Sequence, residues 1–189
     1  MTQTYAGIEK TIRERRTINQ FTAEPVSRET MLELLETAVW APFHSRKEPW
    51  RFILFIGEGR KQFSDAVLQT YTEEKRQQFG EKVADIYCND VPVHLLVVMV
   101  EEPRLKEWEE ALCATSALIQ NLQLLAWEKG IGGVWKTNDY NWNPSFREAV
   151  GVKPGEKVVG TLHMGYFDEA KVRRGKLRTP AADLLTVIN

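Results

Sequence analysis

Two clusters of basic side chains, near opposite ends of the chain, are the residues best suited to chemistry. The first contains Arg13, Arg15 and Arg16 and is followed by Thr17. The second lies within residues 171–178, where five of the eight residues are basic and none is acidic. Guanidinium forks and a hydroxyl group suit a phosphate, so the clusters predict an anion site. A solvated charged surface is the alternative, and each cluster taken alone favours it.

Two further segments, residues 41–50 and 130–137, combine polar groups with features that suit a ligand. The first joins an apolar helical pattern to a buried strand pattern, and such loops often carry ligand-binding residues. Its His44, taken alone, is more typical of surface or packing positions. The second begins with the sequence G-I-G-G, and paired glycines let a backbone approach a flat ligand closely. An ordinary helix end followed by a strand is the alternative.

Several kinds of site are not expected. The three histidines and two cysteines are spread along the chain without metal-ligand spacing, so no sequence-local metal site is predicted. A G-x-G pair at residues 57–59 has Gln62 where a dinucleotide fingerprint needs its third glycine. Neither a P-loop motif nor a nucleophile-elbow motif occurs.

Composition narrows the class of protein further. The 25 basic and 26 acidic residues give a net charge of −1, so a global basic field for nucleic acid is absent. The longest apolar run, residues 95–100, is too short to span a membrane, and residues 1–10 lack the apolar stretch of a secretory signal. We therefore expect a cytoplasmic protein that binds neither nucleic acid nor membrane.

The elements that must position these residues follow from hydrophobic periodicity. Strands separated by covering helices favour a three-layer α/β/α or α+β arrangement around one sheet, in a single domain over residues 1–189. Ser27 is a predicted N-cap, and Pro42 ends the helix that follows. Residues 72–90 are polar with no firm period, and the last 20 residues lack a core pattern. Helices are predicted over 6–16, 27–39, 61–75, 105–129 and 145–149, and strands over 51–56, 93–100, 134–137 and 157–166.

Taken together, these segments resemble the FMN-dependent nitroreductase family. The blocks come in the family's order and span almost the whole chain, and the short length is similar to the small single-domain branch. The resemblance is carried by R-R-T at 15–17 with Phe21, by the A-P…P-W-R-F loop at 41–52, by G-I-G-G at 130–133, by G-Y at 165–166 and by K-L-R-T-P at 176–180.

The resemblance implies a fold, a cofactor and partners. The fold would be a three-layer α/β/α sandwich of the α+β class, in a domain-intertwined homodimer with FMN at the subunit interface. Residues 168–189 would be a tail that packs on the partner subunit. Electrons would pass from NADH or NADPH to a small-molecule oxidant, a nitroaromatic or a quinone, by a ping-pong scheme. Flavin N5 would carry the chemistry, so no catalytic side chain is predicted.

The resemblance also assigns cofactor-binding residues. Arg15, Thr17, Lys176 and Arg178 would hold the FMN phosphate and ribityl chain, with Arg16 in support. Trp40 and His44 would come from the partner subunit, and Trp135, Lys136 and Thr137 would line the flavin. The full predicted set is Arg15, Arg16, Thr17, Asn19, Trp40, His44, Arg46, Gly132, Gly133, Trp135, Lys136, Thr137, Lys176 and Arg178.

Departures from the family pattern leave the tuning of the flavin open. Asn19 stands where the family has a second basic residue, and Arg46 and Glu48 replace the usual Asn and Gln of the loop. We hypothesise that Lys136 or Arg46 supplies positive charge near flavin N1 and O2. Two alternatives remain open: a related dehalogenating or flavin-modifying enzyme with residues 70–90 as a lid, and a non-enzymatic dimer that binds nucleotides.

Overall fold

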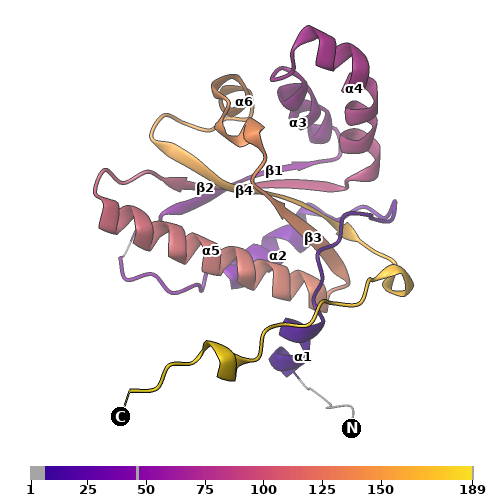
Figure 1. Cartoon of the computed structure of the whole chain (residues 1–189). Helices are drawn as coiled ribbons and strands as arrows, with labels where there is room; N and C mark the ends of the chain where they lie inside the picture. Colours follow the sequence, from indigo (N-terminus) through magenta and orange to yellow (C-terminus); the bar gives the residue numbers. More distant parts are fainter. Residues whose placement is uncertain (1–6, 46, 189) are drawn as a thin grey trace.

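A four-stranded antiparallel sheet organises the molecule (Figure 1). The computed structural model describes residues 7–45 and 47–188. The strand order is β1-β2-β4-β3, so the last two strands of the chain are exchanged in the sheet. The strands are β1 (Trp50–Ile56), β2 (Val93–Val100), β3 (Ile131–Lys136) and β4 (Glu156–Tyr166).

Helices cover both faces of this sheet (Figure 1). On one face lie α2 (Arg28–Ala38) and α5 (Leu105–Glu128), and on the other lie α3 (Gly59–Leu68), α4 (Glu73–Asp85) and α6 (Pro144–Ala149). Strand β2 is apolar on both sides because alternate residues belong to two separate cores: Leu95 packs with the α2–α5 side and Leu96 with the α3–α6 side. The predicted α+β sandwich is therefore confirmed.

Local sequence signals set several of these boundaries as predicted. The hydroxyl of Ser27 accepts the N–H of Thr30 at 3.0 Å, which caps the start of α2. Helix α5 ends at Glu128, and the chain turns at Gly130, which adopts φ +71°, a conformation that favours glycine. The following strand starts at Ile131, three residues earlier than predicted, so Gly132 and Gly133 belong to β3 and do not end the helix.

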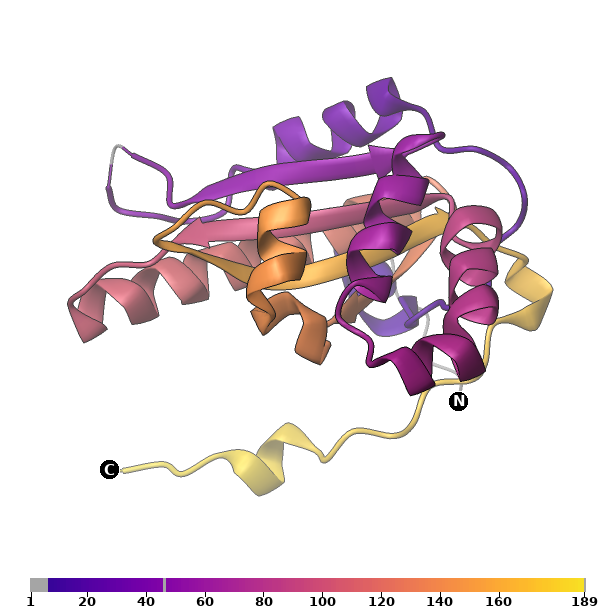
Figure 2. The same ribbon diagram turned by 90° about the horizontal axis from the view of Figure 1, so that it is seen from above.

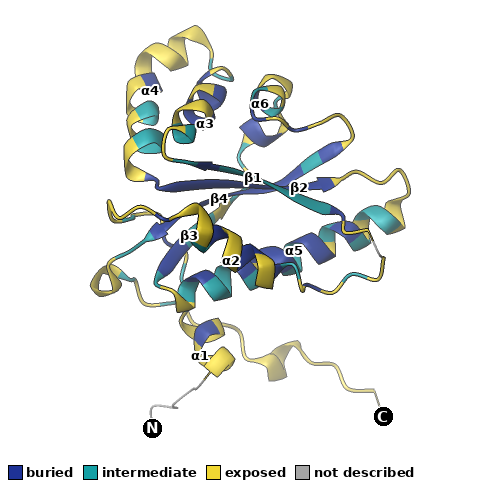
Figure 3. Ribbon diagram, turned by 180° about the vertical axis from the view of Figure 1, so that it is seen from behind, coloured by how far each residue is buried: buried dark blue, intermediate teal, exposed yellow. Residues whose placement is uncertain are grey.

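The prediction of one helix over 61–75 is wrong. Helix α3 ends at Leu68, and a new helix, α4, begins after Thr72, whose hydroxyl accepts the N–H of Lys75 at 3.3 Å. The polar stretch after residue 72 thus contains 13 helical residues. Figure 3 shows that α4 is largely exposed, so it buries no apolar stripe that a periodic pattern could reveal. A π-turn over Ile86–Asp90 (η1) joins it to β2.

The two ends of the chain lie on the same side of the molecule. Helix α1 (Gly7–Glu14) packs beside α5, and the tail passes α1 before running away from the body (Figures 1 and 2). Three short 3-10 turns complete the fold: η2 (Asp139–Trp142), η3 (Glu169–Lys171) and η4 (Ala181–Leu184). Across residues 7–45 and 47–188, every helix is too short or too polar to cross a membrane.

Candidate functional site

The segment that follows α1 runs alongside β3. Thr17 forms a parallel bridge with Gly133, and the N–H of Ile18 donates to the carbonyl of Gly133 at 3.1 Å. A Cβ atom at Gly132 would collide with the buried Ile18 side chain and with Phe167. The space beside Gly132 is therefore filled by the protein's own side chains. The missing Cβ at this position admits the N-terminal segment, and Gly132 also lines the recess beside Arg15.

Three arginines from the two basic clusters meet beside β3. Burial lowers the pKa of the half-buried Arg15, and the neighbouring charges of Arg16 and Arg178 lower it further. The tail passes so close that a Cβ atom at Gly175 would collide with the guanidinium of Arg16. Arg16 in turn donates to the carbonyls of Arg13 at 2.6 Å and of Arg15 at 2.8 Å. The structure thus brings together segments that are about 160 residues apart in the sequence.

No carboxylate compensates these charges within the part of the chain that the structure describes. Arg15 and Arg178 form no ion pair there, and Lys176 is exposed. Three like charges at one place repel one another, and an anion relieves that repulsion. The simple surface interpretation does not account for a half-buried arginine that lacks a carboxylate partner. The arrangement fits an anion such as a phosphate.

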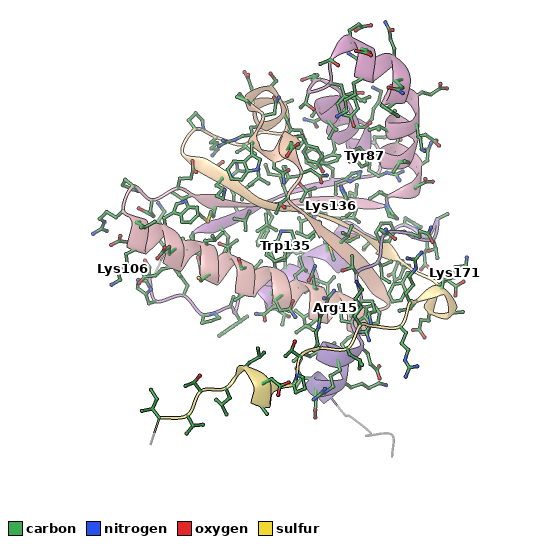
Figure 4. All side chains as sticks on the ribbon, viewed as in Figure 1. Arg15, Tyr87, Lys106, Trp135, Lys136 and Lys171 are labelled. Carbon is green, nitrogen blue, oxygen red and sulfur yellow. The ribbon has the colours of Figure 1, made fainter. Side chains whose placement is uncertain are left out.

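A small recess adjoins the arginines between α5 and β3. Arg15 and Arg16 line it together with mostly apolar residues. Figure 4 shows Arg15 at this corner, beside the tail and below the sheet. Other lining residues include Gln123, Trp127, Gly132 and Met164. Its space, about 10 Å³, is close to what one water molecule needs, so the recess holds no aromatic ring and offers a ligand the two arginines at its edge.

The C-terminal end of β3 carries the next predicted residues. The indole of Trp135 lies over Gly160 and donates to the carbonyl of Val159 at 3.3 Å, yet 37% of the residue stays exposed. Lys136 is half-buried, and its carbonyl accepts from Asn141 at 3.3 Å. Thr137 is exposed, as is Asn19 in the segment that follows α1.

Trp40 and His44 lie elsewhere. Trp40 is 86% exposed, and Nε2 of His44 is 3.6 Å from the carboxylate of Glu110. Glu110 and Trp127 sit on the same helix α5, about 25 Å apart along its axis. Figure 4 shows the neighbouring Lys106 at one end of α5 and Arg15 at the other. Within one chain, these loop residues do not reach the arginines, and Arg46 lies outside the described residues.

A buried polar cluster on the other face of the sheet was not predicted. His94 of β2 and His163 of β4 face each other with their Nδ1 atoms 2.8 Å apart, and both are almost fully buried. Their wide separation in the sequence gave no reason to expect a common site. The available signal was a histidine inside each apolar strand, where a polar side chain needs a partner. Within the described residues, no group of three or more metal-ligating side chains forms.

Comparison with known proteins identifies the fold family. The model of the nitroreductase family matches residues 12–166, which covers most of the chain. The chain belongs to the nitroreductase family. The predicted resemblance is confirmed, and membership makes this chain an oxidoreductase.

Individual relatives agree with this nitroreductase assignment. The chain is 41% identical over 183 residues to YfhC of Bacillus subtilis (strain 168), provisionally named an NAD(P)H nitroreductase, covering 93% of this chain and 91% of YfhC. A nitroreductase-like family protein from Bacillus cereus has a solved structure with a TM-score of 0.91 and 44% identity, over 100% of this chain and 99% of that one.

A more distant structure shares the fold alone. NfnB of Sphigopyxis sp. strain HMH, described as an FMN and NADPH-dependent nitroreductase, aligns with a TM-score of 0.76 over 97% of this chain and 100% of NfnB, at 18% identity. The nitroreductase fold is thus kept at low identity, while the ligands of NfnB are a property of that protein.

Proposed function

We propose that this chain binds FMN and passes electrons from NADH or NADPH to a nitroaromatic or quinone-like acceptor. The observation that carries the proposal is the meeting of Arg15, Arg16 and Arg178 without a carboxylate partner in the described residues. A phosphate monoester is the anion that such a cluster of guanidinium groups suits best. The FMN phosphate is such a group, and relatives of this fold are named as FMN-dependent.

The residues present fit the rest of the cofactor as well. The C-terminal end of β3 offers backbone groups, the partly exposed Trp135 and the half-buried Lys136 for the ring. In this proposal Thr17 and Lys176 complete the phosphate and ribityl contacts. Trp135 to Thr137 lie along the ring. Bound FMN supplies the hydride-accepting and hydride-donating chemistry.

The protein's own residues bind and shield in this scheme. The arginine cluster holds the anionic end, so the ring's position is fixed from the phosphate outward. The exposed Trp135 offers an aromatic face beside the ring's expected position. Electron donor and acceptor would occupy the same cleft in turn, which is a ping-pong scheme.

A homodimer is part of the proposal because one chain leaves the site unfinished. Trp40 and His44 do not reach the arginines of their own chain, and we propose that they reach those of the partner. The tail and α1 also expose apolar side chains that a second subunit would cover (Figure 3). These are Ile8, Ile12, Leu177, Leu184, Leu185, Val187 and Ile188.

The first test is the absorbance spectrum of the purified protein. We expect the bands of oxidised flavin, bleaching on addition of NADH or NADPH, and recovery when a nitroaromatic or a quinone is added. A colourless protein that takes up no added FMN contradicts the proposal. Bleaching without any turnover of nitroaromatics or quinones points to a related flavin enzyme acting on another acceptor, with residues 70–90, which contain the exposed helix α4, as its candidate lid.

A further inference from the structure

The buried pair of His94 and His163 forms an ordered polar chain beneath α3. Nδ1 of His94 lies 2.8 Å from Nδ1 of His163, and Nε2 of His94 lies 2.8 Å from the carbonyl oxygen of Tyr87. The ring of Phe63 stacks on His94 with centroids 4.1 Å apart. Both histidines are nearly inaccessible to solvent, at 0% and 4% exposure. Because the two rings are buried and packed against other rings, they have little freedom to rotate and exchange their donor and acceptor nitrogens.

The protons of the pair follow from its contacts. A carbonyl oxygen can only accept, so Nε2 of His94 carries a hydrogen and its Nδ1 carries a lone pair. Nδ1 of His163 must then donate to that lone pair, which leaves Nε2 of His163 as an acceptor. Burial keeps both rings neutral: it lowers the pKa of His94 to about 4 and that of His163 well below its usual value.

Nε2 of His163 therefore needs a donor. It is buried and has no hydrogen-bond partner among the described residues. A buried polar atom without a partner costs about 1–3 kcal/mol, so native structures satisfy almost all of them. Nε2 of His163 can therefore accept one hydrogen bond, from a donor on this face of the sheet.

The groups around the pair come from several elements. Helix α3 contributes Ser64 and Arg60, and the charge of Arg60 acts on His94. Tyr87 comes from η1, and Tyr140 comes from η2. Ser64 and Tyr140 are the rival donors because the hydroxyl of each is also buried without a partner. The polar groups that act on the Tyr140 hydroxyl are Tyr87, Asn138 and Thr161. Strand β3 contributes Lys136, whose charge acts on His163.

Strand register brings Lys136 within reach. Val134 pairs with His163, and Lys136 pairs with Thr161, so Lys136 and His163 lie on the same face in diagonal positions. Diagonal neighbours in an antiparallel pair are about 7 Å apart, which a lysine side chain spans. Within the described ranges, the Lys136 ammonium forms no hydrogen bond or ion pair. In Figure 4, Lys136 and Tyr87 are labelled on the part of the molecule away from Arg15.

We propose that the Lys136 ammonium donates a hydrogen bond to Nε2 of His163, and that the His94–His163 pair is the device that positions this lysine. The series of hydrogen bonds then runs from the Tyr87 carbonyl, through two neutral imidazoles of fixed tautomer, to the Lys136 ammonium. It ends at the segment 135–137, beside the expected position of the flavin ring. That last consequence rests on the proposed function, whereas the hydrogen bond itself does not.

The first experiment reads the hydrogen bond in the full chain before and after addition of FMN. Long-range proton–nitrogen NMR spectra of ¹⁵N-labelled protein report which nitrogen of each histidine carries hydrogen. We expect Nε2–H on His94 and Nδ1–H on His163. Lys136→Met keeps the stem and removes the ammonium, and it should shift the Nε2 resonance of His163. The matched control Tyr140→Phe should leave that resonance in place.

Two results would overturn the hydrogen bond. One is hydrogen on Nε2 of His163, and the other is a resonance that moves in Tyr140→Phe and stays fixed in Lys136→Met. The tautomers are read in the unmodified chain, so this test does not depend on a variant that folds.

The second experiment reads the positioning role through the midpoint potential of bound FMN. A cation near the ring favours the anionic reduced flavin, so Lys136→Met should lower the potential. His163→Phe should shift it in the same direction, and the double variant should fall no lower than Lys136→Met alone. Lys157→Met, whose ammonium lies over Trp142, is the control and should leave the potential unchanged.

The two experiments separate the two proposals. If the chain takes up no FMN while the tautomers are as expected, the proposed function fails and the hydrogen bond stands. If FMN binds and His163→Phe leaves the potential unchanged, the positioning role fails and the proposed function stands.

Discussion

Two arginine-rich corners of the molecule differ in how their charge is compensated. In the first, which we call the Arg51 corner, Arg51 donates from Nε to Glu156 at 2.6 Å and from Nη2 to the carbonyl of Gly151 at 2.8 Å. Glu156 also accepts the N–H of Lys153 at 2.6 Å. The hydrogen bond from Arg51 lowers the pKa of Glu156, and the same contact raises the pKa of Arg51.

The second, the Arg15 corner, contains Arg15, Arg16 and Arg178. Here the pKa of Arg15 is lowered, by burial and by two like charges. The Arg51 corner is neutralised within one chain, whereas no carboxylate of the described residues pairs with the Arg15 corner. In the proposed function an anion supplies the missing negative charge, so Arg51 should serve the fold and Arg15 a ligand.

The largest effect should come from breaking the Arg51 corner. Arg51→Met leaves the nearly buried Glu156 carboxylate without its bidentate partner, so we expect the free energy of unfolding to fall by about 3 kcal/mol. This is the low end for a buried pair because the Arg51 side chain is 33% exposed. Urea unfolding measures the loss. FMN affinity of the folded variant should be unchanged, and a stability loss below about 1 kcal/mol would show that Arg51 is not a structural arginine.

The Arg15 corner should respond in the opposite way. Arg15→Ala removes a charge-assisted contact to the phosphate, so FMN affinity should fall about 30-fold, equivalent to about 2 kcal/mol. Stability without FMN should stay the same or rise, because one of three like charges is gone. Fluorescence titration and urea unfolding give the two numbers. A large loss of stability with unchanged affinity would place Arg15 with Arg51 as a structural residue.

The histidine pair predicts how stability depends on pH. The pKa of both histidines is lower in the folded state, so the unfolded chain binds more protons at acid pH. Their contribution is therefore complete above about pH 6.5 and is lost as the pH falls toward about 4, the folded-state value for His94. Between pH 7 and 5.5 we expect a loss on the order of 1 kcal/mol per histidine. A His94→Gln variant with the same pH slope as the parent would contradict this.

The smallest effect is expected at a basic residue that belongs to neither corner. Arg173 lies in the exposed tail and makes no hydrogen bond or ion pair in the described part of the chain. Arg173→Ala should change FMN affinity less than twofold and stability by less than about 0.5 kcal/mol. It is therefore the matched control for Arg15→Ala. A tenfold loss of affinity would add Arg173 to the anion site.

The sequence predicted most of the fold because its signals are local. Ser27, Gly130 and the apolar strand runs depend on capping, backbone freedom and periodicity, which neighbouring residues determine. Helix α4 escaped prediction because an exposed helix buries no stripe. The contact between Gly132 and Ile18 could not be predicted because the two residues are distant in the sequence, and only the pairing of Thr17 with Gly133 brings them together.

The candidate site was predictable to a similar extent. The composition of the basic clusters predicted an anion site, and the family resemblance predicted that the two clusters meet, as Arg15, Arg16 and Arg178 do. The His94–His163 pair could not be predicted, because it depends on the register between β2 and β4. Chemistry carried by residue type is visible in a sequence, whereas chemistry carried by strand pairing is not.

The central claim is that the arginines of the two clusters together form a phosphate site. Its most direct test compares FMN with riboflavin, which lacks the phosphate, in binding titrations of the flavin-free protein and of Arg178→Ala. We predict that the parent binds FMN at least tenfold more tightly than riboflavin. Most of that preference should disappear in Arg178→Ala, while riboflavin affinity stays the same. Equal affinity of the parent for FMN and riboflavin would contradict the account.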